Sequence, residues 1–413
     1  MAAGNNSAGE IWACVVVDTT HIQCGFSGGV HGAVFDWCRD MMGVPAQHPL
    51  PPHYSGYAGK TGLYMAPTQF PVTDPLAGRH QVAFLPVFFD DPVLHVTYMQ
   101  VYEFSMVQPA LTQDCVYDFR GISYPYIGPK VHPDVGHHLA VALDNTDGLY
   151  VFSTVPSSDA PAAGALLGVQ LAQHGEGAIT DLYNITVHGL TPLTAYMPDS
   201  PIAAVHSGLN GHPNVAVLHP LQKILYNVLL TVPSTWVPLQ AAGLANAANQ
   251  LAMVSMPNVS TGGILYSDAT FAIDSAGNLF ETRLEVKAGA LQMGGPSGWM
   301  NNGAALNVGG TSLGASYYRD VNGNPLALAY ALRDNTHGDV VASDYIANTK
   351  TWNGYFSDPN GHLNAVNFLG SQVVPLFHGS GTNLLFGACH KAIDLLCLMG
   401  RTVGAVTQNW STY

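Results

Sequence analysis

Apolar and polar residues alternate along much of this chain in patterns that predict short β-strands. The clearest case is residues 270–286, where apolar runs around Phe271 and Leu279 flank the turn sequence Asp-Ser-Ala-Gly. Asp opens such turns through its side chain and Gly supplies a positive φ, so the segment predicts a β-hairpin. Similar patterns predict strands at residues 81–89, 95–104 and 139–155.

Turn sequences of the same kind recur at residues 144–148, 320–323 and 358–361. Their spacing is irregular, so they predict no regular repeat of the propeller type.

Five other apolar segments favour helices. The segment 218–230 has Pro220 in its first turn, where proline is tolerated, and the segment 388–400 ends at a glycine, a common helix C-cap. The last segment is apolar on almost all sides, which is typical of a buried helix. The predicted helices are residues 30–42, 164–174, 218–230, 239–253 and 388–400.

These elements together predict a β-rich fold, mainly β or α+β. Pro-, Ser- and Gly-rich stretches indicate the boundaries between regions. The predicted division is an N-terminal mixed α/β region at residues 1–160, a helix-containing segment at 161–256, and a β-hairpin-rich region at 257–413 that ends in a buried helix.

Charge is scarce for a chain of 413 residues. Charged residues make up 10%, against about 25% in an average protein, while hydrophobic residues make up 47%. We therefore expect much of the surface to be buried against neighbours. The formal net charge of -14 argues against binding to nucleic acid, because phosphate contacts need Lys and Arg.

The sequence shows no apolar run long enough to span a membrane and no secretory signal, so we expect neither. Its six cysteines form no C-x-x-C pair, and we expect buried thiols in a reducing compartment.

The stretch Gly25-Phe-Ser-Gly-Gly29 matches the G-x-S-x-G pattern of a nucleophile elbow, with Ser27 as the nucleophile. Only 24 residues precede it, too few to build the strands that lie before such an elbow in an α/β-hydrolase. The preferred interpretation is a tight turn, in which Gly25, Gly28 and Gly29 connect the first strand to a helix that begins at Val30.

The segments 15–18 and 24–29 also resemble the first phosphate hairpin of the actin and sugar-kinase superfamily. Residues 142–148 and 308–312 are similar to its second phosphate loop and its adenosine loop. The resemblance implies a nucleotide site in which Asp18 and Asp144 orient water around Mg²⁺. The intervening segments lack the Lys- and Glu-rich helices of that superfamily, so this hypothesis ranks third.

A His-rich segment carries side chains that bind transition metals, namely His132, Asp134, His137 and His138. It contains Pro and Gly and no H-E-x-x-H pattern, so the predicted role is a solvent-facing or interfacial one.

Glu281 and Glu285 share one strand face with Arg283, which indicates a solvated face rather than a catalytic carboxylate pair. We assign no catalytic, cofactor-binding or metal-binding residue and expect no cofactor.

In composition the chain resembles the coat proteins of non-enveloped icosahedral viruses, with few charges and many Gly, Ala, Asn, Thr and Pro. The resemblance implies a jelly-roll-like β-sandwich with several packing helices. It also implies a non-enzymatic protein that self-assembles, with identical subunits and other shell proteins, into a capsid or outer shell layer. Such a protein is found in the virion and is assembled in the host cytoplasm.

The absence of a basic arm in the sequence favours a shell layer with no strong direct nucleic-acid binding. The alternative is a carbohydrate-binding or carbohydrate-active β protein, in which some of the 19 Tyr line a sugar-binding surface.

Overall fold

The computed structural model describes the backbone of thirty strands, of residues 201 and 207–212, and of a turn at 288–289. Side chains are described for residues 140–142, 150, 152, 201–217, 229, 251–255, 266–272 and 282–292. All regular elements in this described part are strands in antiparallel sheets, so the predicted β-rich fold is confirmed. The described residues include no helix that is able to cross a membrane.

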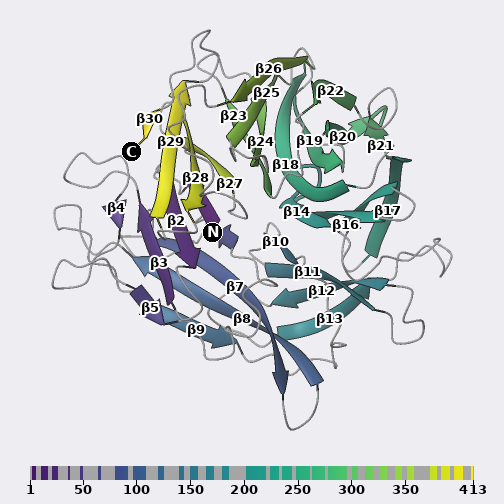
Figure 1. Cartoon of the computed structure of the whole chain (residues 1–413). Coiled ribbons are helices and arrows are strands. Elements are labelled where there is room, and N and C mark those ends of the chain that lie inside the picture. Colours follow the sequence, from purple (N-terminus) through teal and green to yellow (C-terminus); the bar gives the residue numbers. More distant parts are fainter. Residues whose placement is uncertain are drawn as a thin grey trace. The chain divides into compact units, whose positions relative to one another are not determined.

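The chain divides into two compact units. Unit 1 comprises Met1–Lys130 and Val374–Tyr413, and unit 2 comprises Val131–Val373. The described strands form seven sheets, in which most strands pair with their neighbours in the sequence (Figure 1). This sequential pairing is a meander and differs from the crossing Greek-key order of a jelly roll, so the predicted jelly roll is not observed.

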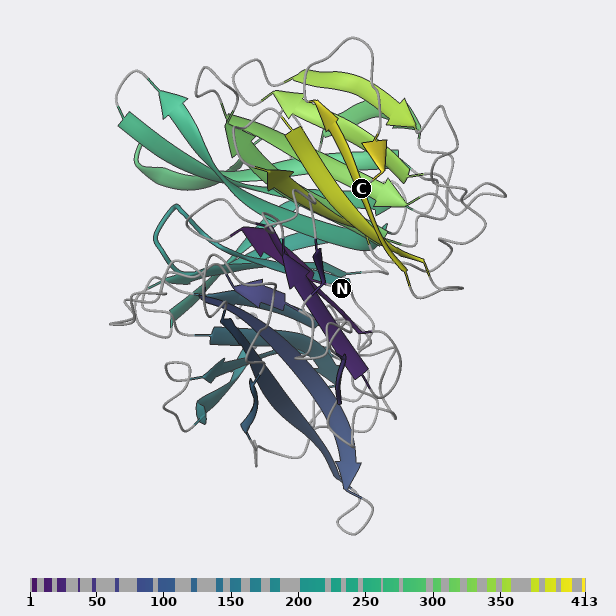
Figure 2. The same cartoon turned by 90° about the vertical axis from the view of Figure 1, so that its left-hand side faces the viewer.

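Unit 1 holds three of these sheets, and its longest hairpin, β7–β8, forms a long blue ribbon in both views (Figures 1 and 2). The first sheet contains β1 (Ala2–Asn5), β2 (Ile11–Val16), β3 (His21–Phe26), β4 (Asp36–Trp37) and β5 (Gln47–Pro49). The second contains β6 (Tyr64–Ala66), β7 (His80–Asp91), β8 (Val96–Val107) and β9 (Arg120–Tyr124). The third contains β27 (Val373–His378), β28 (Asn383–His390), β29 (Leu395–Thr402) and β30 (Ser411–Thr412).

Unit 2 holds the other four sheets. They are β10 (Leu139–Leu143), β11 (Leu149–Pro156), β12 (Gly164–Leu171) and β13 (Ile179–Ile185); then β14 (Ile202–His206), β15 (Pro213–His219), β16 (Ile224–Thr231) and β17 (Thr235–Gly243). The next sheet has β18 (Ala248–Ser260), β19 (Gly263–Asp274), β20 (Asn278–Lys287), β21 (Ala290–Gly294) and β22 (Met300–Ala305). The last has β23 (Ser312–Arg319), β24 (Pro325–Leu332), β25 (Val340–Ile346) and β26 (Thr351–Ser357).

In unit 2 the first strands of consecutive sheets are neighbours: β10 lies next to β14, β14 next to β18, and β18 next to β23. Three of these sheets have four strands, and the third has a four-strand meander with β22 added beside β20. Four-stranded meanders with neighbouring first strands are typical of β-propeller blades, so unit 2 is propeller-like. The irregular spacing of the turn sequences hid this repeat, because the strands and the loops between them differ in length from sheet to sheet.

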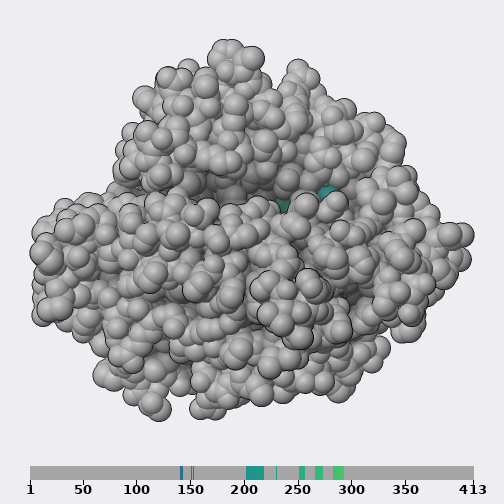
Figure 3. Space-filling view, turned by 60° about the horizontal axis from the view of Figure 1, so that its bottom comes forward, coloured from purple at the N-terminus to yellow at the C-terminus, as the bar shows by residue number. Residues whose placement is uncertain are grey.

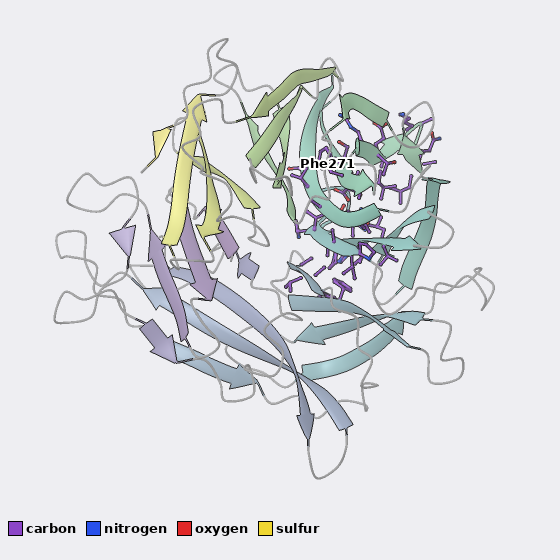
Figure 4. The ribbon with its side chains drawn as sticks, viewed as in Figure 1. Phe271 is labelled. Carbon is purple, nitrogen blue, oxygen red and sulfur yellow. The ribbon has the colours of Figure 1, made fainter. Side chains whose placement is uncertain are left out.

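Consecutive residues are buried along several strands of unit 2, including 140–142, 214–217, 251–254 and 267–272. Because successive side chains of a strand point to opposite faces, both faces of these sheets are covered. Phe271, labelled in Figure 4, is fully buried on one face, and its neighbours Thr270 and Ala272 are fully buried on the other. Sheets covered on both faces need few charged residues, which accounts for part of the low charge of the chain.

The strands predicted at residues 81–89, 95–104 and 139–155 are confirmed, as is the hairpin of β19 and β20. Four of the five predicted helices are wrong. The segments 164–174, 218–230, 239–253 and 388–400 contribute to β12, to β15 and β16, to β17 and β18, and to β28 and β29. Short apolar runs are compatible with a buried strand or a buried helix, and pairing with neighbouring strands decided for the strand.

Two further expectations concern the N-terminal region. Of the helix predicted at 30–42, the structure describes only β4, a strand. Gly25 lies inside β3, opposite Ala13 and Trp37, and not in a turn. The division into regions 1–160, 161–256 and 257–413 stays a prediction.

The turn between β20 and β21 holds a strained residue. Ala288 has φ 51° and is followed by Gly289 with φ 78°, while Lys287 pairs with Ala290. Two positive φ values in a two-residue hairpin loop are typical of a type I′ turn, for which Asn-Gly is the preferred sequence.

We expect Ala288→Asn to raise the free energy of unfolding by about 0.5–1 kcal/mol, because Asn tolerates the left-handed region better than Ala. Chemical denaturation checks this. Gly289→Ala is the matched opposite change and lowers stability, since no atom lies within 4 Å of the added Cβ and only the backbone conformation opposes it. Equal stability of the Asn variant and the wild type contradicts the assignment of strain.

Candidate functional site

A compact turn joins β14 to β15 in unit 2. The amide of Ser207 donates to the carbonyl of His212 at 2.9 Å, and the amide of Gly211 donates to the carbonyl of Ser207 at 2.8 Å. The side chain of Asn210 accepts a further bond from the amide of His212 at 3.0 Å. Gly211 has φ 76°, a conformation that glycine adopts without strain. The turn is therefore fixed by its own hydrogen bonds.

A buried carboxylate lies against this turn. Asp268, in the middle of β19, is fully buried, and its Oδ2 accepts hydrogen bonds from the Ser207 hydroxyl at 2.5 Å and from the Asn214 side-chain amide at 2.8 Å. Both donors are also fully buried. The bonds join the β14–β15 turn and the start of β15 to β19 of the neighbouring sheet, and the residues that they connect are 61 and 54 positions apart.

Ser255 completes the arrangement, which we call the Asp268 cluster (Ser207, Asn214, Ser255 and Asp268). Ser255 lies directly opposite Asp268 on β18, and its hydroxyl faces the carboxylate. The Ser255 oxygen accepts a hydrogen bond from the Gly208 amide at 2.8 Å, and the Ser207 oxygen accepts one from the Leu209 amide at 3.2 Å. Ser207 thus connects the carboxylate to the backbone of the turn, and Ser255 connects β18 to the same turn.

Burial raises the pKa of Asp268 above its ordinary value, because the charged form loses its hydration. The hydrogen bonds from Ser207 and Asn214 and the proximity of the Ser255 hydroxyl act in the opposite direction, as does His206. Desolvation is the largest of these effects, so the carboxylate takes up a proton more readily than an exposed Asp does.

One aromatic ring of the same strand reaches solvent. Tyr266 precedes Asp268 by two positions, so the two side chains lie on the same face of β19. The side chain of Tyr266 is 38% exposed, although it packs against Gly208. A Cβ placed on Gly208 would lie 2.1 Å from Cδ1 and 2.4 Å from Cγ of Tyr266. The ring fits in this position only because residue 208 has no side chain.

Most other described side chains are hidden. On the face drawn in Figure 3, the coloured residues reach the surface in a few small areas only. Tyr266 and Val286 are the exposed large hydrophobic residues among those whose side chains the structure describes. Tyr266 differs from Val286 in lying beside the Asp268 cluster.

The residues singled out from the sequence lie mostly elsewhere. Asp18, Ser27, Asp144 and the segment 132–138 are outside the described residues, so the nucleophile, nucleotide and metal hypotheses are untested there. Among the side chains that are described, no three or more of His, Cys, Asp and Glu come together as a metal site would require.

The predicted solvated face of β20 is only partly correct. Glu285 is half-buried and forms an ion pair with Lys287 at 2.7 Å, but Arg283 between the two glutamates is 4% exposed. The side chain of Glu281 is outside the described set. Glu285 pairs with Ser267, whereas Asp268 pairs with Leu284, so the carboxylates of Asp268 and Glu285 lie on opposite faces of the sheet.

Sequence reasoning missed the Asp268 cluster. One signal was present, since Asp268 is a charged residue in the middle of a strand whose other residues, apart from the terminal Asp274, are uncharged. A carboxylate in such a position needs buried donors, but nothing in the sequence identifies Ser207 and Asn214 as those donors.

No protein-family model matches this chain, and no curated protein matches it. The periplasmic gluconolactonase of Pseudomonas aeruginosa is similar in structure, with a TM-score of 0.51 and 11% identity over 98% of this chain and 94% of that chain. This likeness shows a shared fold.

Other similar structures have lower scores. One is the Aleuria aurantia lectin in complex with α-methyl-L-fucoside, with a TM-score of 0.41 and 9% identity over 100% of this chain and 93% of the lectin. Another is an α-L-arabinofuranosidase from Podospora anserina in complex with cellotriose, with a TM-score of 0.35 and 12% identity over 70% of this chain and 93% of that enzyme.

The expected function as a viral capsid or outer-shell protein is wrong. It implied a jelly-roll shell fold, whereas the solved structure that shares the fold of this chain is a gluconolactonase and not a coat protein. A low charge content is common to coat proteins and to chains whose sheets are covered on both faces, so composition alone did not separate the two classes.

We expect Asp268→Ala to lower the free energy of unfolding by about 2–4 kcal/mol, because two buried donors lose their acceptor and a cavity is left. The matched control is Ser267→Ala, which removes a buried polar group from the opposite face of the same strand. Denaturant titration of both variants provides the measurement. A loss no larger than that of the control contradicts the role of Asp268 in joining the two sheets.

The raised pKa of Asp268 predicts a pH dependence of stability. At a pH between the pKa of Asp268 in the unfolded state and its higher pKa in the folded state, the folded state binds more protons. The contribution of Asp268 to stability is therefore fully present below the unfolded-state pKa and is lost as pH rises through the folded-state pKa. Asp268→Asn does not titrate at this position. The stability difference between wild type and this variant should therefore move in favour of the wild type on acidification from about pH 8 to about pH 4. A difference that is constant with pH contradicts the raised pKa.

Proposed function

We propose that this chain binds neutral carbohydrates and that the ring of Tyr266 is a stacking surface for the sugar. The observation that carries the proposal is the combination of exposure and fixed position in one aromatic side chain. Tyr266 is 38% exposed, yet its ring rests on the backbone of Gly208 at a distance that leaves no space for a methyl group.

A fixed aromatic ring suits a sugar for two physical reasons. The face of an aromatic ring carries partial negative charge, which attracts the weakly positive C–H groups that line one side of a pyranose. A side chain that is already held in one orientation also loses little conformational entropy when the ligand binds. The phenol hydroxyl of Tyr266 adds a group that forms hydrogen bonds with sugar hydroxyls. His206, which precedes Ser207 of the turn, is also exposed.

The charge of the chain favours neutral over acidic sugars. The formal net charge is -14, and a negative protein repels a carboxylated or sulfated ligand over distances of about one Debye length. The fold shared with a gluconolactonase is compatible with this ligand class, but a fold alone does not fix a function.

Binding without hydrolysis agrees best with the described side chains. Glycosidases use two carboxyl groups that flank one bond, separated by about 5–9.5 Å. The carboxylates described here, Asp268 and Glu285, lie on opposite faces of their sheet, and Asp268 is inaccessible to a ligand. We therefore propose a binding protein rather than an enzyme.

The test is a titration of the purified chain with methyl glycosides of glucose, galactose, mannose, fucose and xylose, with glucuronic acid as the acidic comparison. We expect at least one neutral glycoside to bind, and we expect Tyr266→Ala to weaken it about tenfold, corresponding to about 1–1.5 kcal/mol of aromatic contact. Isothermal titration calorimetry gives the Kd.

Two variants serve as controls. Tyr266→Phe keeps the ring and should retain most of the affinity, and Val286→Ala removes the other exposed apolar side chain and should leave Kd unchanged. Wild-type affinity in Tyr266→Ala, or no binding to any neutral glycoside, refutes the proposed function.

A further inference from the structure

We infer that Ser255 and Asp268 are positioning residues that hold Gly208 beneath the Tyr266 ring and so set the orientation of the ring toward a ligand. The inference rests on the proposed function and adds to it the residues that hold Gly208, and with it the Tyr266 ring, in place. It connects three observations, which are the position of the ring on Gly208, the bond from Gly208 to Ser255, and the buried carboxylate beside both serines.

The first step is the contact between Gly208 and the ring. A Cβ on residue 208 would approach three ring atoms of Tyr266, at 2.1, 2.4 and 2.6 Å. The ring edge therefore lies directly over the Cα of Gly208, and any displacement of this backbone moves or releases the ring. The position of Gly208 thus determines the position of the exposed aromatic surface.

The second step is what holds Gly208. Its amide donates to the Ser255 oxygen at 2.8 Å, and this bond crosses from the β14–β15 turn to β18 in the neighbouring sheet. The bonds within the turn fix its shape, but they do not fix its distance from β19. The Ser255 bond is the direct connection between the residue under the ring and the sheet that carries the ring.

The third step is the direction of the hydroxyl protons. A serine hydroxyl has one proton and two lone pairs, so it accepts a backbone amide well when its own proton is engaged elsewhere. The hydroxyl of Ser207 donates to Asp268, and the hydroxyl of Ser255 faces the same carboxylate. The Ser207 oxygen, whose proton is directed to the carboxylate, accepts the amide of Leu209, and the Ser255 oxygen accepts the amide of Gly208.

Asp268 thereby acts on the surface without touching it. It is fully buried, two positions from Tyr266 on the same face of β19, and its contacts with the turn pass through side chains that are themselves buried or half-buried. The buried carboxylate of Asp268 therefore helps to fix the position of the exposed Tyr266 ring.

The experiment uses the full chain and two independent readouts. The first is the Kd for the neutral methyl glycoside that binds wild type most tightly. The second is the ring-current shift of the Gly208 α-protons by NMR with labelled glycine, with Tyr266→Leu as the reference without a ring. The second readout needs no ligand, so it separates the position of the ring from sugar binding.

We expect Ser255→Ala to weaken sugar binding about fivefold, in keeping with the loss of one hydrogen bond, and to move the Gly208 shift toward the Tyr266→Leu value. Ser255→Thr keeps the hydroxyl and should show the wild-type Kd and the wild-type Gly208 shift. Ser267→Ala, a buried serine change on the opposite face of β19, should leave both unchanged. Circular dichroism verifies that each variant is folded.

Gly208→Ala is a second variant, which keeps every hydrogen bond of the turn and displaces the ring by contact alone. It should weaken binding at least as much as Ser255→Ala. If wild type binds sugar through Tyr266 but Ser255→Ala retains both the affinity and the Gly208 shift, the inference is overturned and the proposed function stands. If wild type binds no sugar, the proposed function is overturned, and an unchanged shift in Ser255→Ala overturns the positioning role as well.

Discussion

The buried carboxylate of Asp268 is the constraint on which the described part of unit 2 depends. Removing a carboxylate from water costs several kcal/mol unless buried donors replace the lost hydration. Ser207 and Asn214 supply those donors from one sheet, and Ser255 faces the carboxylate from the other. Because a polar cluster of this kind tolerates little displacement, it fixes the β14–β15 turn against β18 and β19.

This constraint follows from the architecture. The sheets of unit 2 are meanders whose first strands are neighbours, and their buried residues run consecutively along β15, β18 and β19. Apolar contacts between such sheets are non-directional and allow sliding, whereas hydrogen bonds to one carboxylate permit a single alignment. This alignment brings Gly208 under Tyr266. The hydrogen bonds that the buried carboxylate needs thereby fix the position of the exposed Tyr266 ring.

The errors made from sequence share a cause. The segments predicted as helices at 164–174 and 218–230 are apolar runs of about one strand or hairpin, and their ambiguity was resolved by pairing with strands distant from the local window. The low charge suggested a surface hidden by other copies of the chain, yet in unit 2 residues are hidden by neighbouring sheets of the same chain. Composition reports how much surface is buried and not what buries it.

The sequence by itself determined the strands at residues 81–89 and 95–104 and the pairs within 139–155 and 270–286, because alternation of side chains and the φ preferences of Asp and Gly act within a few residues. It predicted the antiparallel pairing of β19 and β20. Only the tertiary structure decided that Asp268 meets Ser207 and Asn214, which lie 61 and 54 positions away. Hydrogen bonds and close contacts such as that of Gly208 with Tyr266 depend on distances in space, and residue spacing along the chain does not encode them until the sheets are in place.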